Sequence, residues 1–122
     1  MTPLDLGYIA GFFDGEGSVG IVRPKARNGK RYPKLRARIA QNQRDVLEWI
    51  SATVGFGCVH TEKRLYGRER KLMHRFVVTD QQAERFLAVI RPYLRVKAVD
   101  VDAAVATLRK ERKKSTPRSS SG

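Results

Sequence analysis

"YIAGFFDGEGSVGIV", residues 8–22, is the stretch that decides the fold of this 122-residue chain. Its first half is apolar enough for a buried helix, yet it belongs to a run with three glycines spaced by four, and each interior glycine costs a helix about 1 kcal/mol relative to alanine. The helix then ends on two acids, Asp14 and Glu16, where a helix terminus is already negative. A stable helix here requires other interactions that offset the cost of the glycines and of the two acids.

The glycines predict a close helix–helix contact. Gly7, Gly11 and Gly15, with Ala10 alongside, lie along one stripe of the predicted helix. Small residues at this spacing allow another backbone to approach closely. No other segment of the chain offers an equivalent glycine stripe. We therefore predict that the mate is the same helix in a second copy of the chain, related by a twofold axis.

The two acids are then explained by the same symmetry. A twofold contact would bring two copies of Glu16 together at the negative ends of both helices, where like charges repel unless cations intervene. Mg²⁺ suits such a position because it takes few carboxylates, keeps water ligands and shares phosphate oxygens. The alternative is that Asp14 and Glu16 only cap or solvate a helix end, which is the usual role of an isolated acidic pair.

The charge of the chain indicates a polyanionic partner. The formal net charge is +13, and no acidic residue occurs between Glu16 and Asp45. Within that interval residues 23–38 carry eight lysines and arginines. Nucleic acid is favoured over a membrane surface because no basic amphipathic helix carries the charge. The alternative is an idle basic surface, although solvated surfaces normally mix charges of both signs.

Length and composition predict one folded domain. With 41% hydrophobic residues the chain can bury a modest core, and no apolar run is long enough to cross a bilayer. The N-terminus lacks the features of a secretory signal, so we expect a soluble protein that acts inside the cell, at its DNA, and is not secreted. Cys58 is the single cysteine, which excludes an intrachain disulfide, and we expect a small buried side chain there.

Strict alternation marks residues 34–41 as a strand with two different faces. Together with residues 18–22 this segment predicts a β-hairpin whose long tip, 24–33, is basic and rich in turn residues. The expected core face carries Leu35, Ala37 and Ile39, and the opposite face carries Lys34, Arg36 and Arg38.

The remaining pattern completes an α+β order, α-β-β-α-β-β-α, followed by a C-terminal helix. Four antiparallel strands would form one sheet with helices on a single face, which leaves a basic open face suited to a duplex groove. Thr2, Asn42 and Thr79 are predicted helix caps. We expect residues 1–112 to form the domain and residues 113–122, basic and then serine-rich, to be disordered. The other predicted elements are a first helix at 3–15, helices at 43–54, 80–90 and 97–112, and strands at 58–65 and 71–79.

The motif "IAGFFDGEG", residues 9–17, resembles the signature nonapeptide of the LAGLIDADG homing endonucleases. Ala10, Gly11, Asp14 and Gly17 are identical to it. The resemblance extends over roughly residues 4–108, in the expected order. It includes "IAQNQRDVLEWI" (39–50), "VGFG" (54–57) and "FLAVIRPYLRVK" (86–97).

A single motif in a short chain is similar to the homodimeric branch of this family. The resemblance implies a saddle-shaped sheet and an intron-encoded enzyme that cuts both strands of a long, pseudo-palindromic double-stranded DNA site, with Mg²⁺ as cofactor. By position, Glu16 matches the catalytic acid that binds the divalent ions, although it replaces the aspartate of the signature. Gln41 matches a glutamine that helps to hold metal or water, and Lys97 a basic residue near the scissile phosphate. Asp14 matches an acid that is mainly structural near the helix interface.

The resemblance also assigns DNA contacts to the two strand pairs. From the first pair these are Arg23, Lys25, Lys34, Arg36 and Arg38, and from the second His60, Glu62, Arg64, Lys71 and Arg75. For Gln41 the simpler alternative is a polar group at a strand end, and for Lys97 a surface lysine at the start of a helix.

A non-cleaving binding protein is the main alternative function. The same fold serves in intron RNA maturases and in transcriptional regulators. Those proteins would keep the basic open face but would not need Glu16, Gln41 and Lys97 together. RNA is a partner only under the maturase alternative.

Overall fold

The computed structural model describes residues 1–66 and 68–115, without the side chains of 64–66, 69, 70, 114 and 115. Its elements follow the predicted order. They are α1 (Pro3–Glu16), β1 (Gly17–Val22), β2 (Lys34–Gln41), α2 (Arg44–Val54), β3 (Cys58–Tyr66), β4 (Glu69–Thr79), α3 (Asp80–Ile90), the short 3-10 helix η1 (Arg91–Tyr93) and α4 (Ala98–Ser115).

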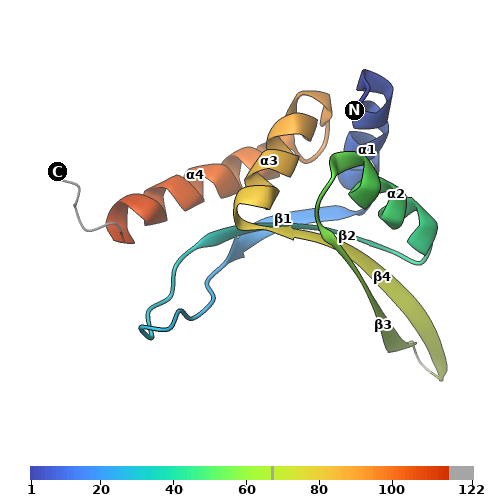
Figure 1. Cartoon of the computed structure of the whole chain (residues 1–122), viewed down its shortest axis with the longest axis horizontal. Coiled ribbons are helices and arrows are strands. Elements are labelled where there is room, and N and C mark those ends of the chain that lie inside the picture. Colours follow the sequence, from blue (N-terminus) through green and yellow to red (C-terminus); the bar gives the residue numbers. More distant parts are fainter. Residues whose placement is uncertain (67, 116–122) are drawn as a thin grey trace.

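The four strands form one antiparallel sheet in the order β1-β2-β4-β3. Figure 1 shows the helices on one side of this arched sheet, with the β1–β2 and β3–β4 hairpins descending at its two ends. No helix of the described residues lies on the opposite side of the sheet. The predicted α+β class, with one covered and one open face, is confirmed.

The core lies between the sheet and the helices. Leu35, Ala37 and Ile39 of β2 are fully buried, as the alternation predicts, and pack with residues of β4 and of the helices. Leu72 alternates along β4 with the buried Phe76 and Val78, which predicts a core position, but it is 50% exposed. The cause is that pairing between β2 and β4 ends at Gln41 and His74, so β4 continues beyond the packed layer.

Helix caps agree with the sequence only in part. Thr2 and Asp5 form the reciprocal capping box of α1, with the Asp5 N–H donating to the Thr2 hydroxyl at 3.1 Å. Thr79 stands at the N-cap of α3, but its side chain makes no capping hydrogen bond there. The N-cap of α2 is Gln43 rather than Asn42.

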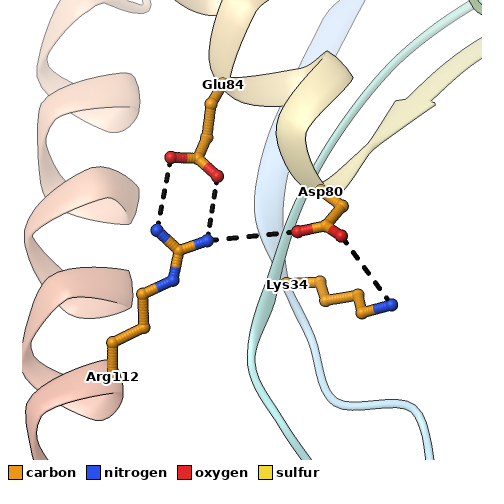
Figure 2. A network of polar contacts seen from close by, with 4 residues as sticks. All are labelled: Lys34, Asp80, Glu84 and Arg112. Atoms are coloured by element: carbon orange, nitrogen blue, oxygen red, sulfur yellow. Dashed lines mark hydrogen bonds and ion pairs between the residues drawn. The ribbon is translucent and has the colours of Figure 1, made fainter. Parts of the chain in front are cut away.

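Ion pairs attach α4 to the rest of the domain. Arg112 of α4 meets both carboxylate oxygens of Glu84 at 2.9 and 3.3 Å, and lies 4.0 Å from Asp80 at the start of α3. Asp80 in turn lies 3.9 Å from Lys34 at the start of β2 (Figure 2). The network therefore joins α4, α3 and β2.

Two further expectations differ from the structure. α4 runs to Ser115, three residues beyond its predicted end, and the rest of the predicted tail, 116–122, lies outside the described residues. Cys58 is exposed at the start of β3 instead of buried. Among the described residues, no helix is long and apolar enough to cross a bilayer.

Candidate functional site

The carboxylate of Asp14 binds the start of α4. It accepts hydrogen bonds from the backbone N–H groups of Arg95, Val96 and Lys97 at 2.8, 3.1 and 2.9 Å. Burial acts to raise the pKa of Asp14, but these backbone hydrogen bonds and the charge of Lys97 outweigh it and hold the pKa below the ordinary aspartate value. Asp14 was expected at the interface between two copies of the chain. Its side chain is bound within its own chain.

Lys97 completes this contact from the other side. Its ammonium donates a hydrogen bond to the main-chain carbonyl of Asp14 at 2.7 Å. The last turn of α1 has no basic residue of its own, so Lys97 provides the positive charge that a helix C-terminus favours. The group predicted to act near a phosphate is therefore hydrogen-bonded within its own chain.

The structure brings Glu16 and Gln41 together. Both line a cleft of about 350 Å³ where α1 ends and β2 ends, and Glu16 is exposed. The Oε1 atom of Gln41 accepts the backbone N–H of Asn42 at 2.9 Å, which leaves its amide N–H groups as donors. Lys97 is not among the residues that line the cleft, whereas Lys71 is.

The side chains that line the cleft supply part of the ligand set that a magnesium ion needs. Among the described side chains that line the cleft, Glu16 is the single carboxylate, and Gln41 and Asn42 add amide groups. Within the described part of the chain, no three His, Cys, Asp or Glu side chains are grouped so that they could hold a metal ion. Mg²⁺ needs only one or two protein carboxylates when phosphate oxygens and water complete its shell. The residues present therefore fit such an ion together with a nucleic-acid phosphate.

An open glycine stripe runs along α1. Gly7, Gly11 and Gly15 are exposed, and a Cβ atom at any of them would meet nothing within 4 Å. Leu4, one turn earlier on this helix, is 86% exposed. Ala10 was expected on the stripe, but it is fully buried. The correction follows from helix geometry, since Ala10 belongs to the side of α1 that packs on the sheet.

Basic residues gather on the open face of the sheet. A hollow of about 250 Å³ is lined by side chains from β2, β3 and β4. Arg38 donates to the hydroxyl of Ser18 at 3.3 Å, and Arg75 forms an ion pair with Glu62. Five of the ten predicted nucleic-acid contacts therefore share one surface, which we call the basic hollow. They are Arg36, Arg38, His60, Glu62 and Arg75.

Other predicted contacts lie elsewhere. Arg23 forms a two-pronged ion pair with Glu111 of α4, so it contributes to the attachment of that helix. Lys25 pairs with Arg31 in an isolated bridge in the hairpin tip, and Lys34 takes part in the network of Figure 2. The side chain of Arg64 lies outside the described part of the structure.

Sequence reasoning missed a series of hydrogen-bonded polar side chains in which His74 is the buried member. His74 is 8% exposed, and its Nδ1 atom lies 2.7 Å from the Thr61 hydroxyl, which also accepts a hydrogen bond from Arg44. Arg44 in turn donates to Glu48 at 3.1 Å. These hydrogen bonds attach the strand pair β3–β4 to α2. His74 is also the register partner of Gln41. The usable signal was a histidine at a core-facing position of an alternating strand.

Three comparisons with known proteins agree with this geometry. The sequence profile of the LAGLIDADG endonuclease family matches residues 9–97. Reverse gyrase of Thermococcus kodakarensis is 27% identical over 106 residues. That match covers 86% of this chain but only 6% of reverse gyrase, so the chain spans a small part of that relative's length.

Solved structures show the same fold. The homing endonuclease I-CvuI, in complex with its target in the presence of calcium, superposes with a TM-score of 0.70 at 23% identity, over 93% of this chain and 71% of that one. The archaeal intron-encoded homing endonuclease I-Vdi141I, complexed with DNA, gives a TM-score of 0.60 at 22% identity, over 98% of this chain and 86% of that one.

Proposed function

This chain belongs to the LAGLIDADG endonuclease family, and we propose that it is a site-specific homing endonuclease that cleaves both strands of double-stranded DNA. One observation carries the proposal. Glu16 and Gln41, distant in sequence, line a single cleft beside the open face of the sheet. A binding protein needs the open face but does not need a carboxylate beside it.

DNA would lie across the open face of the sheet. The basic hollow supplies three arginines there, and Arg38 comes from the central strand β2. Arginine recognises phosphate and the guanine edge in the major groove, so this surface suits a duplex. Complexes of I-CvuI and I-Vdi141I with DNA support this choice of substrate.

The active form would be a homodimer that contacts itself through α1. The exposed stripe of Gly7, Gly11 and Gly15 would let two copies of the helix approach closely. The contact would also bury Leu4, which lies at the end of the stripe. A twofold contact would also bring together two clefts, each with one carboxylate among the described side chains that line it. The DNA site would then be long and pseudo-palindromic, because a twofold protein matches a twofold site.

Mg²⁺ would be held by Glu16 of both protomers together with phosphate oxygens of the DNA. When bound, it supplies the positive charge that activates water and stabilises the leaving oxygen. Gln41 would orient water or phosphate through its amide N–H groups. Lys97 would act from the same end of α1, and Asp14 would hold that end in place through the start of α4.

The substitution Glu16→Gln tests this assignment. Selection from a randomised duplex library, by binding and by cutting with Mg²⁺, first identifies the site. Glu16→Gln should bind that site as the parent does, because the side chain keeps its size, and should lose strand cleavage. If the substituted protein cuts as fast as the parent, the site assignment is wrong. If the parent binds without cutting, the non-cleaving alternative is correct.

A further inference from the structure

We propose that Lys71 is a further catalytic residue, which contacts the phosphate that is cut. The inference rests on the proposed endonuclease function and adds a basic group to its site. Lys71 was expected only as one of several DNA contacts. The structure places it on the wall of the Glu16 cleft, 55 positions away from Glu16 in the sequence.

The unequal lengths of β2 and β4 create this position. β2 ends at Gln41, opposite His74, while β4 extends a further five residues to Glu69. The extension forms one wall of the cleft through Lys71, Leu72 and Met73. The cleft therefore lies where β2 stops and β4 continues.

Lys71 also faces the side on which DNA would lie. His74, Phe76 and Val78 of β4 are buried under the helices, so the alternate residues belong to the open face. Arg75 lies four residues after Lys71 on the same face of β4, and it lines the basic hollow. A phosphate chain that follows β4 from the basic hollow would reach Lys71 at the cleft.

A cation at this position would add to the positive charge that Mg²⁺ supplies. Glu16 carries a negative charge beside the phosphate, and the transition state of phosphodiester cleavage adds more negative charge on the phosphate oxygens. Lys97 is hydrogen-bonded to the Asp14 carbonyl and does not line the cleft. Lys71 is exposed, and an ammonium placed there would stabilise the developing charge.

The variant Lys71→Met keeps an unbranched side chain, one atom shorter than that of lysine, and removes its charge. Lys63→Met is the matched control, because Lys63 is an exposed residue of β3 whose register partner is Leu72, on the other face of the strand pair. Single-turnover cleavage of the selected site should fall roughly 100-fold in Lys71→Met, the typical loss for one electrostatic donor. Lys71→Arg should retain much of the rate, and Lys63→Met should match the parent.

A binding measurement identifies the phosphate itself. Duplexes that carry one neutral methylphosphonate, placed at each central phosphate in turn, should bind the parent less well at the cut position. Lys71→Met should lose this sensitivity at that position alone. The proposal is overturned if Lys71→Met stays as sensitive as the parent, or cuts as fast as Lys63→Met.

The two hypotheses fail in different ways. The methylphosphonate scan needs binding only, so it decides whether Lys71 contacts a phosphate of the duplex even for a protein that does not cut. Absence of cutting by the parent in Mg²⁺ overturns the endonuclease function instead. Thermal unfolding of both methionine variants, expected to match the parent, confirms that neither result reflects loss of fold.

Discussion

Lys97 and Asp14 are joined twice: the Lys97 ammonium donates to the Asp14 carbonyl at 2.7 Å, and the Asp14 carboxylate accepts the Lys97 backbone N–H at 2.9 Å. These residues are 83 positions apart, so the contact joins the end of α1 to the start of α4. Glu16 follows Asp14 by two residues. The contact therefore fixes the part of α1 that carries the proposed catalytic carboxylate.

Asp14→Asn should destabilise the protein by about 2 kcal/mol, because hydrogen bonds to a charged acceptor are weakened and one oxygen is lost. Urea unfolding at neutral pH measures this loss. Asp100→Asn, at an exposed position in the first turn of α4, is the control and should change stability by much less.

The same residue predicts a dependence on pH. The pKa of folded Asp14 is lower than the ordinary value of 3.8, so its contribution to stability is complete above that value and is lost as the pH falls through the lower, folded pKa. The gap in unfolding free energy between the parent and Asp14→Asn should therefore shrink in acid. A gap that stays constant into strong acid would show that the carboxylate charge is not responsible.

Gly11→Leu should separate folding from dimer formation. A side chain at Gly11 meets nothing within 4 Å in the protomer, and replacement of a helix glycine should favour α1 by up to about 1 kcal/mol. In a homodimer built on α1, the same side chain would block the close approach. Sedimentation should show a stable monomer for Gly11→Leu and a dimer for the parent. Ala103→Leu, on the exposed side of α4, should stay dimeric.

Arg38→Ala should weaken DNA binding by about 1–3 kcal/mol, because Arg38 lies in the basic hollow on the central strand β2. If Arg38 contacts phosphate, the slope of log K against log salt should also fall by about one. Arg109→Ala removes the same charge from α4, within the groove between α3 and α4, and should have little effect. Equal losses for the two variants would mean that only the total charge matters.

Arg112→Gln should lower stability by about 0.5–1 kcal/mol, since the bidentate pair with Glu84 is well formed but exposed (Figure 2). The loss should diminish in high salt, which screens exposed charges. Lys110→Gln, on the same helix, supplies the control for a simple change of net charge. A salt-independent loss would point to packing of the arginine stem instead.

The sequence predicted those features that depend on local periodicity. Alternation in residues 34–41 was sufficient to assign Leu35 to the core and Arg38 to the open face, because successive strand residues point to opposite sides. The capping box of Thr2 was also predictable, since its two partners are three residues apart.

Contacts between distant segments were not predictable in this way. Arg23 looked like a free hairpin arginine until α4 brought Glu111 beside it, 88 positions away. Burial of Ala10 depends on which side of α1 meets the sheet, and periodicity alone does not orient a helix that is apolar all round. Lys71 could not be linked to Glu16 because the end of β2 relative to β4 is set by tertiary packing.

The length of β4 has a consequence for how the protein would choose its target. Its 11 residues extend about 36 Å at roughly 3.3 Å each, close to one turn of B-DNA. Two such sheets, arranged about a twofold axis, would follow roughly two turns of duplex. A protein that contacts so many base pairs can lose about 1–3 kcal/mol of binding free energy at one mismatched base pair and still bind its target selectively. Recognition would then tolerate mutational drift in the target without becoming indiscriminate.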